Sequence, residues 1–211
     1  MEKPVIIFGS TGIAKAALEI FNSNGIVVYG FLDDDKKTHN TEINSVTVLG
    51  STDDHGFLKL IGQKCEAFVA TDDNSLRKRY VEQLMEDRKV MPMNAIHDSA
   101  QVSKSCSIGH GNFINAGAIL SNDSKIGQHN VINSRVVIEQ EAEIADFVQI
   151  GAGSTINSRV TIEEGAFIGT GVTIVSGVTI GKKARIGAGS VVVGDVGKNK
   201  TVFGNPAVEV K

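Results

Sequence analysis

A short glycine-containing loop and a run of aspartates are residues whose types and spacing could do chemistry. The loop Gly9-Ser-Thr-Gly12 follows the apolar run Val5–Phe8. Glycine lets backbone N–H groups approach a diphosphate at the start of the next helix. Asp33 comes 21 residues after Gly12, where a carboxylate can accept from a ribose or a base edge. The full GxGxxG pattern is absent, so a structural turn is an equally good interpretation from these residues alone.

The elements that would position these residues alternate between strand and helix in the first ninety residues. Short apolar runs predict buried strands, and apolar residues at helical spacing predict two helices that pack on them. We expect strands at 5–8, 27–32 and 66–70, and helices at 13–24, where Asn24-Gly25 ends the helix, and at 75–88. This alternation indicates a small N-terminal parallel α/β (Rossmann-like) domain, to which we assign residues 1–92.

A six-residue repeat organises the rest of the chain. Cut from Ala95, the sequence gives 17 consecutive hexads, and the second position is aliphatic in every one: Ile96, Val102, Ile108, Ile114, Leu120, Ile126, Ile132, Ile138, Ile144, Ile150, Ile156, Ile162, Ile168, Ile174, Ile180, Ile186 and Val192. Three hexads close a triangular coil of 18 residues, whose aliphatic side chains stack inside. The repeat predicts a C-terminal left-handed parallel β-helix of hexapeptide repeats, which with a C-terminal tail covers residues 93–211.

Composition excludes several classes of protein. The net charge of -3, without a basic cluster, gives no reason to expect a nucleic-acid partner. The run Val5–Phe8 is too short for a signal peptide or for membrane insertion. Cys65 and Cys106 are spaced for neither a disulfide framework nor a metal knuckle, and no cluster has metal-ligand spacing. We therefore expect a cytoplasmic protein that needs no metal.

The chain resembles the bacterial nucleotide-sugar acetyltransferases of the sialic-acid O-acetyltransferase type, which include enzymes of bacillosamine and perosamine synthesis. The resemblance rests on the GSTG loop, FLDDD, NAIHDSA at the domain junction, the hexads and the VFGNPA tail. It implies a homotrimer of prisms with acetyl-CoA between neighbours and the nucleotide sugar on the small domain. It also implies that the substrate is bound by Gly9, Ser10, Gly12, Asp33, Asp34 and Asn133.

Two departures from the family pattern concern catalysis. Where the family carries a histidine base followed by an acid, this chain has Gln140 and Glu141, and a second family histidine aligns with Gln149. A third departure is Ile13, which stands where the family often has histidine. Gln140 takes no proton, so three interpretations stay open: an active enzyme that acts on an amine without an imidazole base, a substitute residue, or a catalytically silent homologue. His110 and His129 are the nearby histidines, and we expect both at solvent-exposed corners.

The coenzyme positions implied by the resemblance are Gln149, Ser158, Thr170, Gly187 and Ala188. Lys182, Lys183 and Arg185 could meet the CoA phosphates or simply form a solvated face. Asn74 and Arg77 match a family Asn-x-x-Arg, although helix capping and a solvated face are the favoured interpretation.

The resulting hypothesis is an acetyl-CoA-dependent N-acetyltransferase that acts on a nucleotide-linked amino sugar. The alternatives are O-acetylation of a sialic-acid-like sugar and a nucleotide-sugar-binding homologue without activity.

Overall fold

The computed structural model describes residues 3–210 of the chain. The chain divides after Asp98 into two compact units. The division falls six residues after the end that we expected for the first domain. No helix among residues 3–210 is long and apolar enough to cross a membrane.

The first unit is built on a five-stranded sheet in the order β3-β4-β2-β1-β5. Its parallel strands are β1 (Val5–Phe8), β2 (Val28–Leu32), β4 (Val46–Gly50) and β5 (Glu66–Val69), and β3 (Glu42–Ile43) is antiparallel to β4. Every residue of β1 is buried, as expected for a central parallel strand. β2 and β5 lie on opposite sides of β1, so the strand order reverses there, which is where parallel sheets bind ligands.

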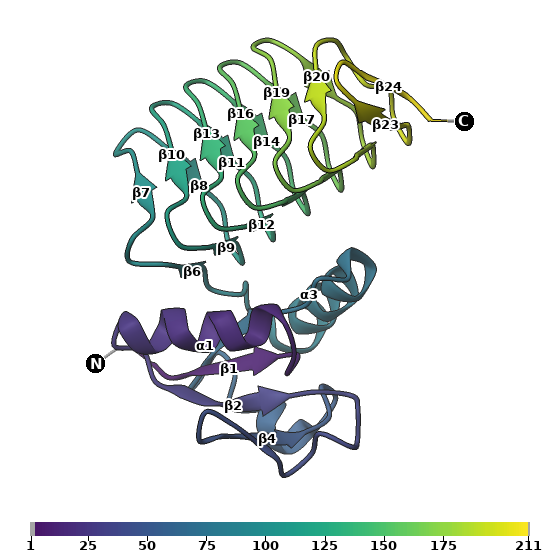
Figure 1. The fold of residues 1–211 in the computed structure, drawn as a ribbon. Coiled ribbons are helices and arrows are strands. Elements are labelled where there is room, and N and C mark those ends of the chain that lie inside the picture. Colours follow the sequence, from purple (N-terminus) through teal and green to yellow (C-terminus); the bar gives the residue numbers. More distant parts are fainter. Residues whose placement is uncertain (1–2, 211) are drawn as a thin grey trace. The chain divides into compact units, whose positions relative to one another are not determined.

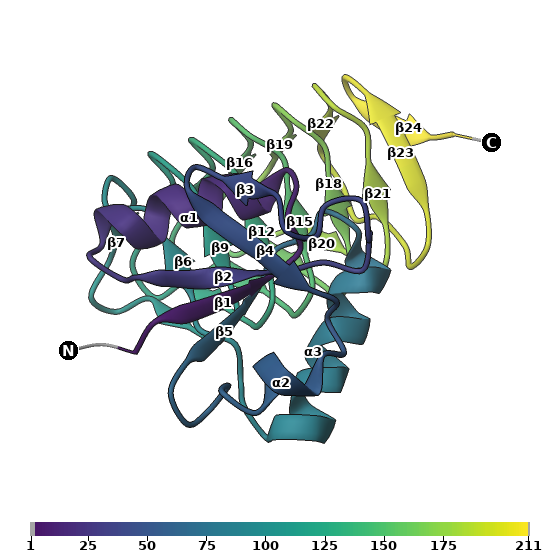
Figure 2. The ribbon, with the colours of Figure 1, turned by 90° about the horizontal axis from the view of Figure 1, so that it is seen from below.

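Three helices of the described residues complete this unit: α1 (Ile13–Ser23) and α3 (Asn74–Arg88), both labelled in Figure 1, and α2 (His55–Leu58), labelled in Figure 2. The α1 helix ends where the sequence predicts, because Gly25 adopts a φ of 75° directly after the C-cap residue Asn24. Phe21 of α1 meets Phe68 of β5 edge to face, with ring centroids 5.5 Å apart.

The sequence analysis missed the β3–β4 hairpin and α2. The hairpin turns on Asn44 and Ser45, which both have positive φ, as a two-residue hairpin loop requires. Asn44-Ser45 is a weaker signal for this turn than Asn-Gly. α2 has only four residues, with Asp54 as its N-cap, and is too short to show a helical period.

The second unit is a β-helix of two-residue strands, each at the first two positions of a hexad. The strand β6 (Ala95–Ile96) has the same pattern but precedes the division after Asp98, so the second unit begins with β7. Face 1 holds β7 (Gln101–Val102), β10 (Ile119–Leu120), β13 (Val137–Ile138), β16 (Thr155–Ile156), β19 (Thr173–Ile174) and β22 (Val191–Val192). Face 2 holds β8 (Ser107–Ile108), β11 (Lys125–Ile126), β14 (Glu143–Ile144), β17 (Thr161–Ile162) and β20 (Thr179–Ile180). Face 3 holds β9 (Phe113–Ile114), β12 (Val131–Ile132), β15 (Gln149–Ile150), β18 (Phe167–Ile168) and β21 (Arg185–Ile186). The chain visits the faces in this order in every coil, so corner 1–2 joins face 1 to face 2, and corner 3–1 joins face 3 to face 1.

Strands one coil apart pair in parallel with a register of 18 residues, as with Ile132 and Ile150. The second hexad positions fill the interior, and from Ile114 onwards they are nearly inaccessible. The interior is open at its start, where Val102 is 39 % exposed. The fifth hexad position has a positive φ from Gly111 to Gly189, because the chain turns there. These observations confirm the predicted prism.

The prism ends in a short hairpin of β23 (Thr201–Gly204) and β24 (Ala207–Glu209), which Figure 2 shows in yellow at the far end of the coils. β23 continues face 3, because Thr201 pairs in parallel with Arg185. The predicted VFGNPA tail is therefore the last part of the prism rather than a free extension.

Candidate active site

The first unit has a cavity of about 260 Å³ at the carboxyl ends of β1, β2 and β5. It is lined by Gly9, Thr11, Asp33, Asp35, Thr38, Ala70, Thr71, Leu76 and Tyr80. Its only charged lining groups are the two carboxylates, so it suits a ligand that offers N–H or O–H donors. Of the predicted substrate residues, Gly9 and Asp33 line this cavity.

The glycine loop leaves the N-terminus of α1 open. Gly9 has a φ of 99°, and a Cβ there would lie 2.4 Å from the carbonyl oxygen of Ala70, so no other residue fits. Gly12 is the N-cap of α1, with no side-chain cap and no acidic residue in the first helical turn. No acidic residue of the first turn of α1 offsets the helix dipole, which favours an anion such as a diphosphate. The Asp72 carboxylate lies close by, however, because a Cβ on Gly12 would be 2.8 Å from its Oδ2.

Ser10 and Asp33 form the link between this loop and β2. The Ser10 hydroxyl donates to Oδ2 of Asp33 at 2.5 Å, and the backbone N–H of Asp35 donates to Oδ1 at 2.9 Å. Each oxygen of Asp33 keeps a second lone pair. Ser10 is 3 % exposed, so it fixes Asp33 rather than facing a ligand itself.

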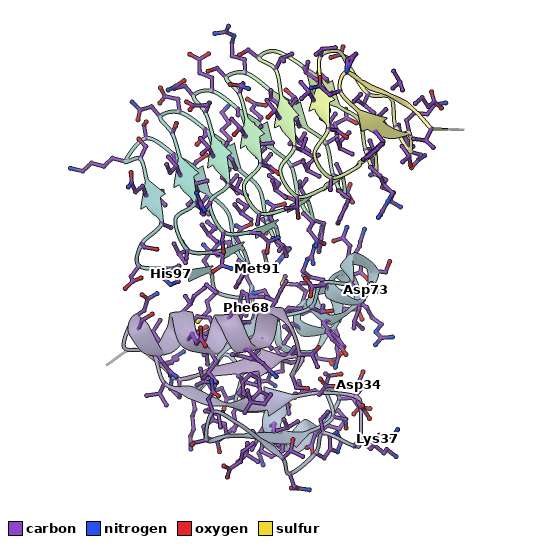
Figure 3. All side chains as sticks on the ribbon, in the orientation of Figure 1. Asp34, Lys37, Phe68, Asp73, Met91 and His97 are labelled. Atoms are coloured by element: carbon purple, nitrogen blue, oxygen red, sulfur yellow. The ribbon has the colours of Figure 1, made fainter. Side chains whose placement is uncertain are left out.

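Asp34 points elsewhere, although it follows Asp33 directly. Its Oδ1 accepts from both the backbone N–H and the hydroxyl of Thr52, and its Oδ2 accepts from Tyr80 and Arg79. Figure 3 shows Asp34 on the same side of this unit as Asp73, at the start of α3. Burial raises the pKa of Asp34, but the Thr52 and Tyr80 hydrogen bonds and the Arg79 charge outweigh it and hold the pKa below its ordinary value.

Asn74 and Arg77 come together, but not as a cap or a solvated face. Asp73 is the N-cap of α3, and the Arg77 guanidinium donates to Asn74 Oδ1 at 2.6 Å and to the Thr71 carbonyl at 2.8 Å. Arg77 is 1 % exposed, and desolvation lowers its pKa to about 10. The expected solvated position is wrong for Arg77, because its guanidinium holds the loop that lines the cavity.

Three predicted residues of the second unit meet at corner 1–2. Ser158 donates to the Gln140 side-chain oxygen at 3.0 Å. Glu141 has a φ of 60° and lies 4.0 Å from the Arg159 guanidinium. Position 140 thus presents a neutral amide with a carboxylate beside it, and neither side chain is buried.

The other predicted positions gather at corner 3–1. Thr170 and Ala188 are one coil apart, and the Thr170 carbonyl accepts from the N–H of Gly189 at 2.8 Å. A Cβ on Gly187 would lie 2.2 Å from the Phe203 ring, which is 55 % exposed, so a larger residue there would have to displace that ring. Asn133 donates its amide to the Ile150 carbonyl at 2.9 Å, a structural bond at the end of a strand.

The remaining candidates lie on other parts of the prism. Gln149 is on face 3, where Arg185 stacks over Phe167 with its Cζ 4.6 Å from the ring centroid. Lys182 is bound to Glu164 at 2.6 Å, and Lys183 is another corner residue with a φ of 57°.

His110 is exposed, as expected, whereas the expected exposure of His129 is wrong. His129 is 4 % exposed, because the Phe147 ring one coil later packs on it at 5.0 Å between centroids.

Sequence reasoning missed much of the cavity lining, namely Thr11, Asp35, Thr38, Ala70, Thr71, Leu76 and Tyr80. Ala70 and Thr71 follow β5 directly, so the rule that ligands bind at the carboxyl ends of parallel strands could have found them. Leu76 and Tyr80 belong to the apolar residues at helical spacing that predict the helix at 75–88, so the sequence gave no reason to place them at a ligand site. In residues 3–210, no group of three or more metal-binding side chains could hold an ion.

Comparisons with known proteins agree with this arrangement. The family model of the PglD N-terminal domain matches residues 4–84. The family model of the bacterial transferase hexapeptide (six repeats) matches residues 159–194. A search of curated proteins gave no match. A mutant of perosamine N-acetyltransferase from Caulobacter crescentus, in complex with CoA and GDP-perosamine, is 33 % identical, with a TM-score of 0.90 over 99 % of this chain and 97 % of that one.

Two further solved structures share the whole fold. The acetyltransferase domain of PglB from Neisseria gonorrhoeae FA1090, in complex with acetyl coenzyme A, is 25 % identical, with a TM-score of 0.89 over 100 % of both chains. WeeI from Acinetobacter baumannii AYE has a TM-score of 0.86 at 24 % identity, over 98 % of this chain and 99 % of that one.

An α/β unit joined to a hexad prism defines the class of hexapeptide-repeat transferases. Within that class, this chain belongs to the family of nucleotide-sugar acetyltransferases.

Proposed function

We propose that the protein transfers the acetyl group of acetyl-CoA to the amine of a nucleotide-linked amino sugar. The observation that carries this proposal is the likeness to perosamine N-acetyltransferase over both units, at 33 % identity. The cavity between β1, β2 and β5, with the open N-terminus of α1, supports binding of the nucleotide part. The residues at corner 3–1 support binding of the pantetheine arm, because small side chains leave backbone N–H and C=O groups accessible to its amides.

The reaction needs a free amine. The amine nitrogen attacks the thioester carbon, the C–S bond breaks, and the amine proton passes to the departing thiolate, to water or to Glu141. Gln140 accepts no proton, so it orients groups rather than acting as base. General-base assistance contributes about 10²–10⁴-fold, so its loss slows aminolysis without preventing it. A hydroxyl would suffer more, because it is a poor nucleophile until deprotonated. An amine acceptor therefore fits corner 1–2 better than an alcohol.

The arrangement of the prism faces supports assembly as a homotrimer. Face 1 lies between corner 1–2, with Gln140, and corner 3–1, with Thr170. Its outward side chains from the second strand on are half-buried and all β-branched: Ile119, Val137, Thr155, Thr173 and Val191. Face 2 instead carries the exposed pair Lys125–Glu143. We propose that face 1 packs around a threefold axis, so that corner 1–2 of one protomer meets corner 3–1 of its neighbour.

The setting that we propose is the cytoplasm, which agrees with the two free cysteines, Cys65 and Cys106.

The test is release of the CoA thiol with acetyl-CoA and a panel of GDP-, UDP- and dTDP-linked amino sugars. Thiol release with one or more of these sugars, together with an acetylated amine in the product, is the expected result. A specific observation favours a second candidate, a silent nucleotide-sugar-binding homologue: both family histidines are replaced, by Gln140 and Gln149. Binding of a sugar by calorimetry without any thiol release would establish that candidate instead.

A further inference from the structure

Asp34 connects three elements of the first unit. Its Oδ1 accepts from Thr52, which follows β4, through the backbone N–H at 3.0 Å and the hydroxyl at 2.6 Å. Its Oδ2 accepts from the hydroxyl of Tyr80 on α3 at 3.1 Å and from Arg79 at 3.4 Å. The carboxylate thus has four protein donors for its two oxygens, which fills the usual capacity of a carboxylate.

Tyr80 is the aromatic part of the cavity wall. Its side chain is 4 % exposed, its ring lies 6.0 Å from the Phe8 ring at 58°, and it lines the cavity with Leu76. Burial, followed by the charge and hydrogen bond of Asp34, raises the pKa of Tyr80. The hydroxyl therefore stays protonated at neutral pH and keeps donating to Asp34, which fixes the direction of the ring.

Neighbouring aspartates thus face two different ways. Asp33 lines the cavity, and both of its oxygens keep a lone pair for a ligand. Asp34 does not line the cavity, and its oxygens accept hydrogen bonds from Thr52, Tyr80 and Arg79 instead. Tyr80 is too buried to stack on a base, but it closes the cavity wall, and the shape of that wall depends on how the ring is held.

We propose that Asp34 is a positioning residue for the nucleotide: it holds the Tyr80 side chain, which closes the cavity wall, while Asp33 supplies the polar contact. This inference rests on the proposed function only in taking the cavity as the nucleotide site. It separates two adjacent carboxylates that the sequence presents as equivalent. One binds the ligand, and the other acts through a second side chain.

The test compares Asp34→Ala, Asp34→Asn and Tyr80→Phe by calorimetry with GDP and with UDP as probes. Asp34→Ala should weaken binding of the preferred nucleotide about tenfold, and Asp34→Asn should restore most of it. The asparagine oxygen still accepts from Thr52, and its amide can donate to the Tyr80 oxygen. Tyr80→Phe keeps the ring and loses only the hydroxyl bond, so it should weaken binding about threefold. With turnover, the KM for the nucleotide sugar should rise while the KM for acetyl-CoA stays the same.

Asp54→Asn is the matched control. The Asp54 carboxylate accepts from the N–H of Gly56 at 2.7 Å as the N-cap of α2, and it does not line the cavity. This variant also changes a hydrogen-bonded carboxylate of the first unit. It therefore reports how much nucleotide affinity is lost when the unit is destabilised away from the cavity. We expect its nucleotide affinity to equal that of the wild type.

Two results overturn the proposal. The first is wild-type nucleotide affinity in a folded Asp34→Ala variant, or in Tyr80→Phe if Asp34→Ala does not fold. The second is an equal loss of affinity in Asp34→Ala and Asp54→Asn. Calorimetry measures nucleotide binding without turnover. If the wild type binds nucleotide but transfers no acetyl group, the proposed activity is wrong, and the affinities of the variants still test the role of Asp34. A wild type that binds neither GDP nor UDP, and dTDP no better, overturns both.

Discussion

Ser158 donates a hydrogen bond of 3.0 Å to the side-chain oxygen of Gln140, one coil away at the same corner of the prism. The sequence analysis had placed the first of these residues in the coenzyme site and the second in catalysis. The bond fixes the amide of Gln140 at the position where relatives are expected to carry an imidazole. Because the glutamine amide takes up no proton near neutral pH, this position has no general base.

Gln140→His should raise kcat about tenfold or more, because it supplies an imidazole base whose pKa lies near the working pH. The pH profile of kcat/KM should gain an ionisation at roughly pH 6–7 that the wild type lacks. Thiol release measured across the pH range checks both effects.

Gln140→Ala is the control for that gain, and it should change kcat only about threefold, because no proton transfer is lost. A fall of about 100-fold in Gln140→Ala would show that the amide itself stabilises the transition state, as a donor to the thioester oxygen does.

Glu141→Gln tests the nearby carboxylate as proton acceptor. If Glu141 takes the amine proton, kcat should fall about tenfold or more with little change in either KM. Glu143→Gln, an exposed carboxylate paired with Lys125 on face 2, should have wild-type kcat. Equal activity of both variants would assign the proton to water or to the departing thiolate.

Gly151→Ala should distort corner 3–1. Its Cβ would lie 2.4 Å from the backbone nitrogen of Thr170 and 2.6 Å from the Gly169 carbonyl carbon, so the next coil must shift. We expect a loss of about 1–3 kcal/mol in the free energy of unfolding and a higher KM for acetyl-CoA. Gly194→Ala, where a Cβ meets nothing within 4 Å, should change neither quantity. An unchanged KM in Gly151→Ala would place the coenzyme elsewhere.

Prediction from sequence succeeded where residues repeat. The hexads gave the prism and the inward side chain of each hexad, because stacking forces successive coils into one register. A four-residue helix and a hairpin on Asn44-Ser45 leave no comparable period, so α2 and the β3–β4 hairpin were missed.

The candidate site was predictable only in part. The order of strand, glycine loop and helix located Gly9 and Asp33, since the fold brings them to the carboxyl edge of the sheet. Nothing in the string Asp33-Asp34-Asp35 tells that Asp34 turns towards Thr52 and Tyr80, because those partners are 18 and 46 residues away. The burial of His129 also depends on Phe147, which stacks on it only once the coils are formed.

Ile150→Ala should destabilise the prism strongly. The side chain is fully buried among its equivalents one coil before and after, so its loss removes buried area and leaves a cavity. We expect a decrease of about 3 kcal/mol in the free energy of unfolding, measured by urea denaturation. Val102→Ala, at the open end and 39 % exposed, should lose less than about 1 kcal/mol. Equal losses would contradict the stacked interior.

Stability should fall at acid pH partly through Asp34. Its pKa is lowered in the folded protein, so the unfolded chain binds a proton at a higher pH than the folded one does. The stabilisation is complete above the unfolded pKa and disappears as the pH falls through the folded pKa. Asp34→Asn should therefore lose less stability than the wild type between about pH 6 and about pH 3 in urea titrations. Parallel curves for the two proteins would show that Asp34 does not contribute.

The register of 18 residues holds between successive coils from β7 to β22, as for Ile132 with Ile150, and shortens only at β23, where Arg185 pairs with Thr201. Within those coils it restricts how the length of the prism can change. An insertion or deletion of one residue would turn every later aliphatic side chain from the interior to a corner. Adding or removing one whole coil keeps every remaining side chain in place and changes only the height of the column. Homologues that differ in the length of the prism, and engineered variants of it, should accordingly differ by whole coils.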